Sequence, residues 1–592
     1  MFKCKQLLRR ICVVSYVFLL CGGLVNASNL VSKTNTLIGT QGNGWASGYL
    51  YPGATYPFGM VQFTPTYFTK QLGFVINQLS GAGCDHMGNF PTLPIAGALR
   101  VSPDSILNMQ TPVGKEIGTA GYYAATVDHS IRAELTVTER TGMARYTFSS
   151  KEKQGTVIIG GGVAATPIQV AAIKITGPHS CEGYAEGGAF CGIPTPYKVY
   201  FVAEFDADAE SFGTWKEERL HANHTFAEGS HSGVYFTFPL KEGNQAVQYK
   251  IGVSYVSVEN ARENLRVENP AWDFSAVRQA TQDKWNEYLG KIEVEGDNED
   301  RQMQFYTHLY RSLIHPNVCS DVNGEYMGAD SQVHKTARKF YTSFSNWDTY
   351  RTQTALIAML APEETSDIVM SHYLFAEQSG GGFPRWVLAN IETGVMQGDP
   401  TPILVANAYA FGARTYDPRT LLRTMRYGAE VPGANSQGVL TRPGLEQYLE
   451  KGYYDASILL EYTSSDFAIG RFALQACNDE PVCNWYTQRA MNWKNLFNKE
   501  TGWLQSRNED GSWKRYDADW RESTYKNYFW MVPYDLQGLI DSIGGKEAAE
   551  KRLDEMFRRL DASYGDEWFA SGNEPSFQIP VSYTHLTLPT IA

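Results

Sequence analysis

Residues 249–289, YKIGVSYVSVENARENLRVENPAWDFSAVRQATQDKWNEYL, contain the point at which the chain changes from strand-like to helix-like periodicity. Residues 249–258 alternate large apolar residues with polar or small ones, which is typical of a half-buried β-strand. Residues 276–289 instead have the pattern of a helix and are predicted to form a linker. The change near Trp272 therefore indicates a β-domain followed by a helical domain.

Upstream of this point the strand-like pattern recurs between Gly-rich or polar breaks. The predicted strands lie within residues 122–147, 156–159, 197–205, 233–238 and 249–258. Many short alternating strands favour a β-sandwich, which we assign to residues 28–270, with a linker helix in 271–296.

Downstream of the linker, apolar residues recur at helical spacing. Two sets share one helix face, namely Tyr306, Leu309, Tyr310 and Leu313, and Ala549, Leu553, Met556 and Leu560. Long helical stretches separated by loops with Gly and Pro predict an α/α toroid over residues 297–580. Its active site is expected where loops gather at one end.

The first 27 residues have the features of a signal peptide. A basic start precedes the apolar run 11–20, and Val25-Asn26-Ala27 supplies the small residues of a cleavage site. The run is short for a membrane span, and no other stretch is long and apolar enough. We expect export to the periplasm or the extracellular space, with a lipid anchor at Cys21 as the less favoured alternative because Leu20 precedes it.

The net charge argues against one class of function, and the cysteines predict disulfides instead of a zinc site. The formal net charge is −12, and loss of the basic leader makes the chain more acidic, which argues against nucleic-acid binding. The pairs Cys181/Cys191 and Cys477/Cys483 are close enough in sequence for disulfides in an oxidising compartment. Cys84 and Cys319 have no obvious local partner, and the spacing is not that of a zinc site.

Two Gly- and Pro-rich segments with few charges are candidate site loops. They are residues 51–62, YPGATYPFGMVQ, and residues 79–85, LSGAGCD. Such loops could reach into the pocket of a neighbouring domain, although ordinary turns explain their composition as well.

Residues 344–351, FSNWDTYR, combine an aromatic ring, a carboxylate and a guanidinium. Asp348 and Arg351 are three residues apart, so at a helix start they would share a face beside Trp347. This arrangement could hold a sugar ring, and a buried structural ion pair is the alternative.

Glu522 is a single carboxyl beside many aromatic residues, including Tyr525, Tyr528 and Trp530. Desolvation would raise its pKa, as a general acid for glycosidic cleavage requires. A surface glutamate beside core aromatics is the alternative. The later segment 571–576, SGNEPS, offers an amide and a carboxylate that could bind Ca²⁺ or sugar hydroxyls, or could form a plain turn.

Taken together, these segments resemble glycoside hydrolase family 92, the exported, calcium-dependent, inverting exo-α-mannosidases. The resemblance runs from about residue 39 to 580 and rests on the order of many blocks. Besides the segments above, the blocks include 316–317 (PN), 320–324 (SDVNG), 347–351 (WDTYR), 396–399 (MQGD) and 530–535 (WMVPYD). The family fold is an N-terminal β-sandwich followed by an (α/α)₆ barrel, in agreement with the change of periodicity.

The resemblance also implies roles for individual residues. Glu522 takes the place of the general acid, and Asn573 and Glu574 face the leaving group and the calcium ion. The implied walls of the mannose subsite are Cys84, Asp85, Trp347, Asp348, Arg351 and Asp399. Family members specific for α-1,2 links tend to have His-Glu at the Asn573-Glu574 position, so another linkage or a broader mannose-containing glycan is expected.

Two departures from the family pattern bear on activity. Residues 522–527 are ESTYKN where the family usually has EGNAWQ, and Lys526 near the acid would lower its pKa. Residues 581–592 have no resemblance to the family and no Asp or Glu, so we expect an incomplete barrel, a missing general base and a weak or inactive enzyme. The alternatives are another (α/α)₆ glycosidase and a non-catalytic glycan-binding protein.

Overall fold

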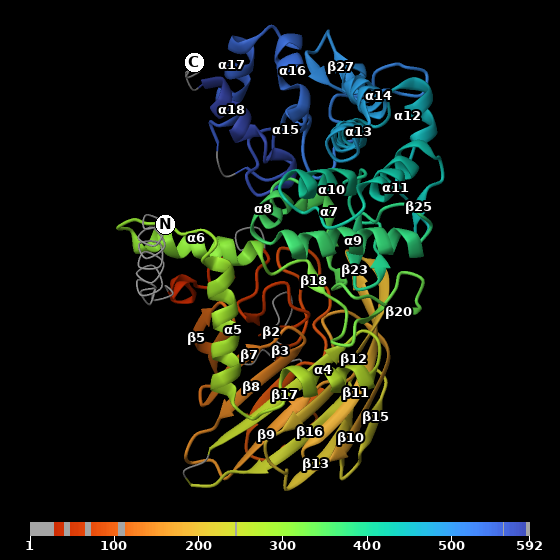
Figure 1. The fold of residues 1–592 in the computed structure, drawn as a ribbon. Helices are drawn as coiled ribbons and strands as arrows, with labels where there is room; N and C mark the ends of the chain where they lie inside the picture. The colour runs from red at the N-terminus through yellow and green to blue at the C-terminus, as the bar shows by residue number, and fades with distance from the viewer. Residues whose placement is uncertain are drawn as a thin grey trace, which may run out of the picture.

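The computed structural model describes residues 29–40, 48–65, 73–104, 113–242, 245–559 and 562–587. The predicted signal peptide, with Cys21, lies outside these residues. Figure 1 shows a β-sandwich at the bottom and a helical part above it, with α9 (Pro362–Gln378) lying across the boundary. A β-domain followed by a helical domain is therefore confirmed.

The sandwich consists of two antiparallel sheets formed by the described residues. One has the order β1 (Ala54–Thr55), β2 (Gln62–Pro65), β3 (Phe74–Val75), β4 (Thr92–Ala96), β9 (Gln154–Ile159), β16 (Ser232–Pro239), β13 (Ser211–Lys216) and β14 (Arg219–Ala222). The other has the order β15 (Phe226–Glu228), β10 (Ile168–Gly177), β11 (Ser180–Phe190), β12 (Ile193–Phe205), β17 (Ala246–Ser254), β8 (Thr141–Thr147), β7 (Ile131–Val137), β6 (Tyr122–Val127) and β5 (Val113–Thr119).

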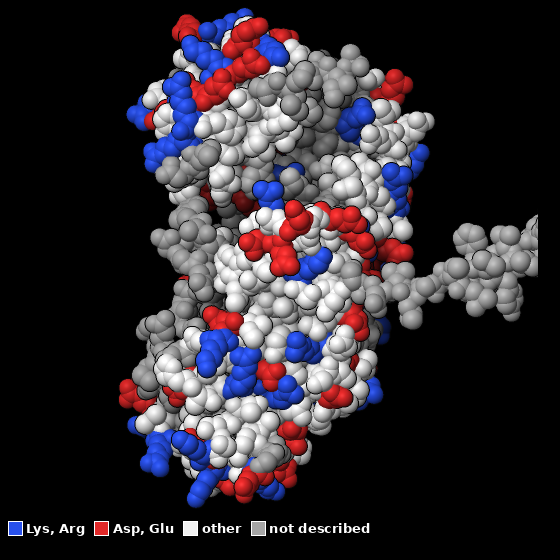
Figure 2. Space-filling model, turned by 90° about the vertical axis from the view of Figure 1, so that its left-hand side faces the viewer, with Lys and Arg blue, Asp and Glu red and all other residues white. Residues whose placement is uncertain are grey.

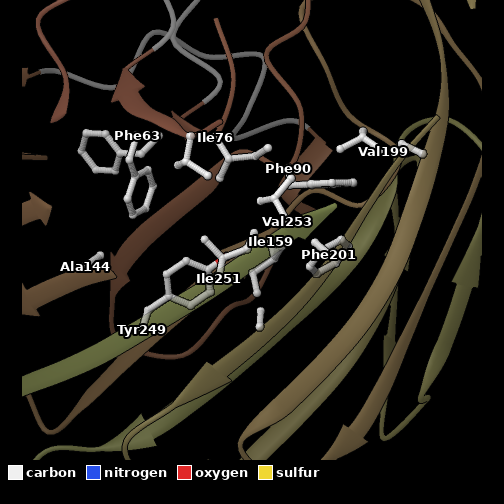
Figure 3. Close-up of a cluster of buried hydrophobic side chains, with 14 of the residues drawn as sticks. Phe63, Ile76, Phe90, Ala144, Ile159, Val199, Phe201, Tyr249, Ile251 and Val253 are labelled. Carbon is white, nitrogen blue, oxygen red and sulfur yellow. The ribbon is translucent and has the colours of Figure 1, made fainter. Parts of the chain in front are cut away.

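The core of the sandwich follows from the alternation of apolar residues in the strands. On β12 and β17, Phe201 pairs with Val253 and both side chains are buried. They meet Ile159 from β9 of the opposite sheet and Phe90, which lies two residues before β4, and the Phe90 and Phe201 ring centroids are 4.3 Å apart (Figure 3). Because successive side chains of a strand point to opposite faces, one alternating pattern is enough to bury one face of each sheet.

The end of the sandwich differs from the prediction for residues 249–258. Strand β17 ends at Ser254, and helix α4 (Val258–Glu268) begins four residues later. Ser257 caps this helix by accepting a hydrogen bond from the Asn260 backbone N–H at 3.0 Å. The segment predicted as a linker helix forms helix α5 (Phe274–Leu289), which runs along the side of the sandwich (Figure 1).

The remaining helices build the upper part of the molecule. They are α6 (Glu299–Ser312), α7 (Asn346–Thr349), α8 (Gln353–Leu360), α9, α10 (Thr401–Ala410), α11 (Pro418–Glu430), α12 (Leu445–Lys451), α13 (Ala456–Cys477), α14 (Glu480–Ala490), α15 (Tyr525–Tyr528), α16 (Leu536–Ser542), α17 (Lys546–Met556) and α18 (Ile579–Thr587). The predicted apolar faces of α6 and α17 are buried, except that Leu560 lies outside the described residues. A closed (α/α)₆ arrangement stays a prediction.

Short antiparallel ribbons connect the helices. They are β18 (Asn317–Val318) with β21 (Tyr341–Thr342), β19 (Glu325–Met327) with β20 (Val333–Lys335), β22 (Phe344–Ser345) with β23 (Trp386–Leu388) and β24 (Ile391–Glu392), β25 (Asn435–Ser436) with β26 (Val439–Leu440), and β27 (Phe497–Asn498) with β28 (Trp503–Leu504). The ribbon of β22, β23 and β24 matters most, because the segment with Asp348 and Arg351 follows β22 directly.

A buried carboxylate joins the two domains. Asp321, between β18 and β19, accepts hydrogen bonds from Ser254 at 2.6 Å, Asn260 at 2.8 Å and Asn264 at 2.6 Å. These partners lie on β17 and α4 of the β-domain. Since buried polar groups are costly unless they are paired, this cluster fixes the position of one domain on the other.

The cysteines pair differently from the prediction. The disulfide joins Cys84 to Cys191, whereas Cys181, Cys477 and Cys483 are buried free thiols, as is Cys319. Cys181 and Cys191 cannot meet, because ten residues of extended strand β11 separate them by roughly 30 Å. Cys477 and Cys483 lie on successive helices, α13 and α14.

The surface and the described helices add two observations. On the face shown in Figure 2, Lys and Arg side chains are interspersed with Asp and Glu side chains. None of the helices in the described part of the chain is both long enough and apolar enough to cross a bilayer. Residues 581–587, for which no family resemblance was expected from the sequence, form the end of α18, and Tyr583 contacts Phe557 at 5.3 Å between ring centroids.

Candidate active site

The WDTYR segment forms a single helical turn, α7, directly after strand β22. Ser345 on β22 pairs with Trp386 on β23, so the indole of Trp386 is brought beside the turn. Its N–H donates a hydrogen bond to the Asp348 carboxyl. The local strand pairing thus determines where Asp348 lies.

Trp347 has a different role from the predicted sugar platform. Its side chain is fully buried, and its indole N–H donates to Glu461 at 2.9 Å. The Arg351 guanidinium lies over the ring, 4.7 Å from its centroid. A ring that has no exposed face cannot stack on a ligand. Trp347 therefore packs against the Arg351 guanidinium instead of forming a platform for a sugar.

Glu461 on α13 is a residue of this region that sequence analysis did not identify. Its carboxylate is fully buried and accepts hydrogen bonds from Trp347, from the Tyr350 hydroxyl at 2.9 Å and from Arg351 Nη2 at 3.0 Å. Burial raises its pKa, against the lowering effect of Arg351 and of these hydrogen bonds. A single charged residue in the apolar run 456–463, ASILLEYT, is the signal that could have indicated it.

Three carboxyls, Asp348, Glu522 and Glu574, interact electrostatically with one another close to Arg351. Burial raises the pKa of Asp348 well above its ordinary value, and the charges of Glu574 and Glu522 add to the effect, whereas Arg351 opposes it. Burial and Glu574 likewise raise the pKa of Glu522. Burial also raises the pKa of Glu574, which shares a hydrogen bond with Asp348. These carboxyls come from three segments that are far apart in the sequence.

The loop that presents Glu522 is strained and anchored. Asp519 and Glu522 both have positive φ, at 65° and 48°, which is unusual for residues with side chains. Ser457 on α13 donates to the Asp519 carbonyl at 2.7 Å, and the Asn573 amide donates to the Glu522 carbonyl. The tight loop is thus fixed at both ends, and it holds Glu522 beside Glu574.

Lys526 does not act on the Glu522 carboxyl as predicted. Its ammonium forms an ion pair with Glu567 at 2.8 Å. The pKa of Glu522 is raised, and the cation that opposes this is Arg521. The predicted weakening of the acid by Lys526 is therefore wrong, because α15 directs the lysine toward the segment that contains Glu567.

Cys84 and Asp85 reach the region through a hairpin of the β-domain. The disulfide from Cys84 ends at Cys191, next to Phe190 at the end of β11. Phe190 stacks on Trp386 with ring centroids 4.2 Å apart, and Trp386 in turn bonds Asp348. Asp85 is exposed, and partial burial raises its pKa. The β-domain thus contributes to the neighbourhood of the carboxyls.

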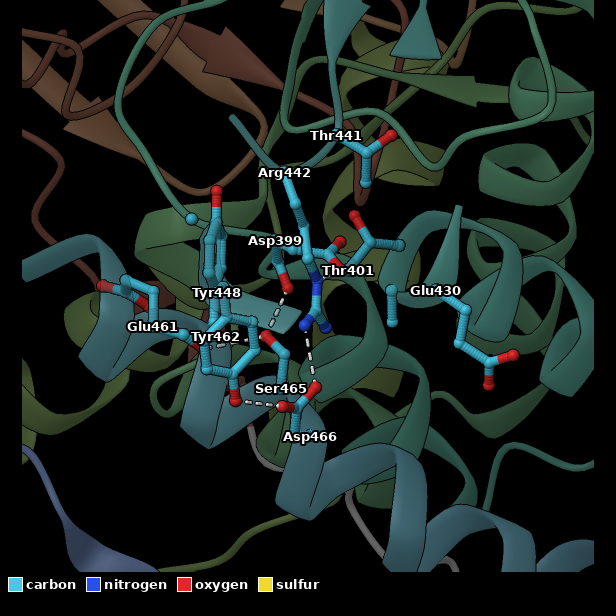
Figure 4. A network of polar contacts seen from close by, with 12 residues as sticks. Asp399, Thr401, Glu430, Thr441, Arg442, Tyr448, Glu461, Tyr462, Ser465 and Asp466 are labelled. Carbon is cyan, nitrogen blue, oxygen red and sulfur yellow. Dashed lines mark hydrogen bonds and ion pairs between the residues drawn. The ribbon is translucent and has the colours of Figure 1, made fainter. Parts of the chain in front are cut away.

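Asp399 belongs to a separate buried network (Figure 4). Its carboxylate pairs with Arg442 at 2.8 Å, and Arg442 also binds Asp466 at 2.7 Å. Asp466 further accepts hydrogen bonds from Tyr448 and Arg489. Because its charge is already compensated by a fully buried arginine, Asp399 has a structural place here that differs from the predicted contact with a sugar.

The described residues supply only part of a metal site. They contain no group of three or more His, Cys, Asp and Glu side chains placed to hold a metal ion. Asn573 donates through its amide nitrogen, which leaves the amide oxygen for a cation, and Glu574 adjoins it. Oxygen atoms of this kind are the ligands that calcium prefers. These two residues fit calcium if other ligands complete the shell.

Comparisons with known proteins agree with this architecture. A family GH92 α-mannosidase from Bacteroides thetaiotaomicron has a TM-score of 0.85 at 25% identity, over 94% of this chain and 78% of that one. It has also been solved with mannoimidazole. An inverting GH92 mannosidase from the same organism has a TM-score of 0.83 at 25% identity, over 94% and 80%.

Sequence comparison gives the same result. An uncharacterized secreted glycosidase from Arthroderma benhamiae is 24% identical over an alignment 660 positions long, gaps included, which covers 95% of this chain and 78% of the relative. Residues 34–254 match the glycosyl hydrolase family 92 N-terminal domain, and residues 260–591 match the family 92 catalytic domain. The expectation that residues 581–592 do not resemble the family is therefore wrong as far as residue 591. The chain therefore belongs to glycosyl hydrolase family 92.

Proposed function

We propose that this protein is an exported, exo-acting α-mannosidase that removes terminal α-linked mannose from glycans with inversion at the anomeric carbon. The observation that carries the proposal is the raised pKa of Glu522, which results from burial and from the neighbouring Glu574 and favours the protonated form. A general acid must be protonated when the substrate binds. The mannosidases among the structural relatives support the choice of sugar.

In this proposal Glu522 transfers its proton to the glycosidic oxygen as the bond between that oxygen and the anomeric carbon breaks. Arg351 and Asp348 hold the hydroxyls of the cleaved mannose, because a guanidinium donates and a carboxyl accepts in fixed directions. By the family resemblance Asn573 would lie on the leaving-group side, at a position where members specific for α-1,2 links tend to have histidine. We therefore propose activity on another linkage or on several.

Calcium completes the proposed site. Asn573 and Glu574 would hold the ion, with substrate hydroxyls and water as the remaining ligands. When bound, calcium supplies positive charge and oxygen coordination for the mannose hydroxyls at C2 and C3.

Inversion also needs an ionised carboxylate that activates water. Asp348 and Glu574 share a hydrogen bond, which requires a proton on one of them and engages both. The described carboxyls around Glu522 thus offer no free general base. Withheld general-base catalysis lowers the rate by roughly 10²–10⁴-fold, so we propose that hydrolysis by this chain is slow.

The test is a comparison of α-1,2-, α-1,3- and α-1,6-mannobiose in buffer with calcium and in buffer with a chelator. We expect slow mannose release that falls on chelation, with β-mannose as the first anomer seen by NMR. Release of another sugar from a panel of aryl glycosides, or cleavage that needs phosphate, would instead identify a different glycosidase or a phosphorylase. Binding of mannosides with no cleavage in any arm would identify a glycan-binding protein.

A further inference from the structure

Arg351 has one polar group that bonds none of the residues described by the structure. Its side chain is only 5% exposed, yet among the described residues its Nε–H has no hydrogen-bond partner. The guanidinium is stacked 4.7 Å from the ring centroids of both Trp347 and Tyr350. A buried donor without a partner is costly, so this N–H is a candidate for a bond to a ligand.

The direction of that N–H depends on the other end of the guanidinium. Arg351 Nη2 is bound to Glu461 Oε1 at 3.0 Å, and the same oxygen accepts the Trp347 indole N–H. The other oxygen, Oε2, accepts the Tyr350 hydroxyl. Three donors from one turn of chain thus converge on a single carboxylate of a different helix.

Glu461 is itself held in place from behind. Gly398 has φ of +78°, and a Cβ atom built there would lie 2.5 Å from the Glu461 Cβ. The backbone at residue 398 therefore packs closely against the base of the Glu461 side chain, with no room for a side chain between them. With three donors in front and this backbone behind, the carboxylate has little freedom to move.

Glu461 is the carboxylate with which Arg351 forms its ion pair. Besides Glu461, the cation interacts with two further carboxyl groups, Asp348 and Glu574, which share one hydrogen bond on the side of the site. Without the charge of Glu461, the guanidinium would be drawn toward Asp348 and Glu574.

We propose that Glu461 is a positioning residue that keeps Arg351 turned away from the site carboxyls, so that its Nε–H stays available for a sugar hydroxyl. The inference rests on the proposed function, because it takes the ligand of Arg351 to be a sugar. Glu461 does not touch the sugar. Its effect is expected in sugar affinity and in KM, through Arg351.

The experiment compares Glu461→Gln and Tyr350→Phe with a matched control, Tyr448→Phe. Tyr350 and Tyr448 are both buried, and each donates its hydroxyl to a carboxylate of α13, Glu461 and Asp466 respectively. Mannoimidazole affinity is measured by calorimetry, kcat and KM with an aryl α-mannoside, and folding by thermal melting.

We expect Glu461→Gln to weaken mannoimidazole binding and raise KM by roughly 10- to 100-fold, the scale of a displaced positioning group. Tyr350→Phe should give a smaller loss in the same direction, with a larger rise in KM than fall in kcat. Tyr448→Phe should lower the melting temperature without changing affinity. Should Glu461→Gln fail to fold, Tyr350→Phe against Tyr448→Phe decides the question alone.

The outcomes separate this inference from the proposed function. Unchanged affinity in a folded Glu461→Gln, or equal losses in the two tyrosine variants, would overturn the positioning role while wild-type activity stands. A wild-type protein that neither binds mannoimidazole nor cleaves a mannoside would overturn both.

Discussion

Asp466→Asn is predicted to destabilise the helical domain by about 3–5 kcal/mol, the usual cost of breaking a buried ion pair. Asp466 is fully buried and binds Arg442 at 2.7 Å, Arg489 Nε at 2.7 Å and the Tyr448 hydroxyl at 2.6 Å. Arg442 keeps a second partner, Asp399 at 2.8 Å. Arg489 loses its anion, but because Arg442 keeps Asp399, only one cation is left without a carboxylate. The cost is therefore expected near the lower end, about 3 kcal/mol.

The assay is urea unfolding followed by circular dichroism at a helix-sensitive wavelength, with Asp417→Asn as the control. Asp417 is exposed and caps α11, and asparagine caps a helix as well as aspartate does. The control should therefore unfold at nearly the same urea concentration as the wild type, as surface substitutions usually do. A loss below about 1 kcal/mol in Asp466→Asn would refute the reasoning, because it would mean that the buried charges are not coupled.

The pH dependence of the same variant provides a second check. Burial opposes ionisation of Asp466, but Arg489 and Arg442 outweigh it, and its pKa lies below the ordinary value. A carboxyl with a lowered pKa in the folded state stabilises it above the unfolded pKa, about 3.9, and this contribution is lost as the pH falls further. The difference between wild type and Asp466→Asn should shrink as the pH falls below about 4.

Three further predictions concern other contacts. Burial raises the pKa of Asp321, so ionising this carboxyl destabilises the folded state. The urea midpoint of the wild type should therefore fall as the pH rises above about 4, and Asp321→Asn should remove this fall. Identical pH profiles of the two proteins would contradict this. Cys84→Ser, measured beside wild type in reductant, should lower the melting temperature and kcat/KM together, whereas Cys319→Ser should leave kcat/KM unchanged; equal effects would contradict the link to the site. Gly398→Ala should lower the melting temperature and raise KM, because of the 2.5 Å approach to Glu461 and the φ of +78°; an unchanged KM would show that this contact does not hold Glu461.

Local patterns in the sequence were sufficient for the fold class. Alternation in the strands and 3.6-residue periodicity in α6 depend only on neighbouring residues, and both were confirmed. The end of β17 was predicted four residues too late, because Val256 and Val258 continue the apolar pattern while the Ser257 cap starts a helix. Cysteine pairing failed for a different reason, since a short separation along a strand is a long distance in space.

The site was predicted in part. Asp348, Arg351, Glu522 and Glu574 were found from motifs, and the structure brings them together. Glu461 was missed because it belongs to no motif and acts through contacts with a segment 110 residues away. The effect of Lys526 was misjudged because sequence distance says nothing about Glu567, the partner that binds it.

The most direct test of the proposed chemistry compares Glu522→Gln with the wild type on two substrates that differ in how much they need a proton. One is an α-mannobiose, whose departing hydroxyl is a poor leaving group, and the other is a dinitrophenyl α-mannoside, whose phenol leaves as an anion. If Glu522 is the proton donor, kcat/KM should fall by roughly 10²–10⁴-fold for mannobiose and change little for the activated substrate. Equal losses on both substrates, or none on mannobiose, would contradict the assignment.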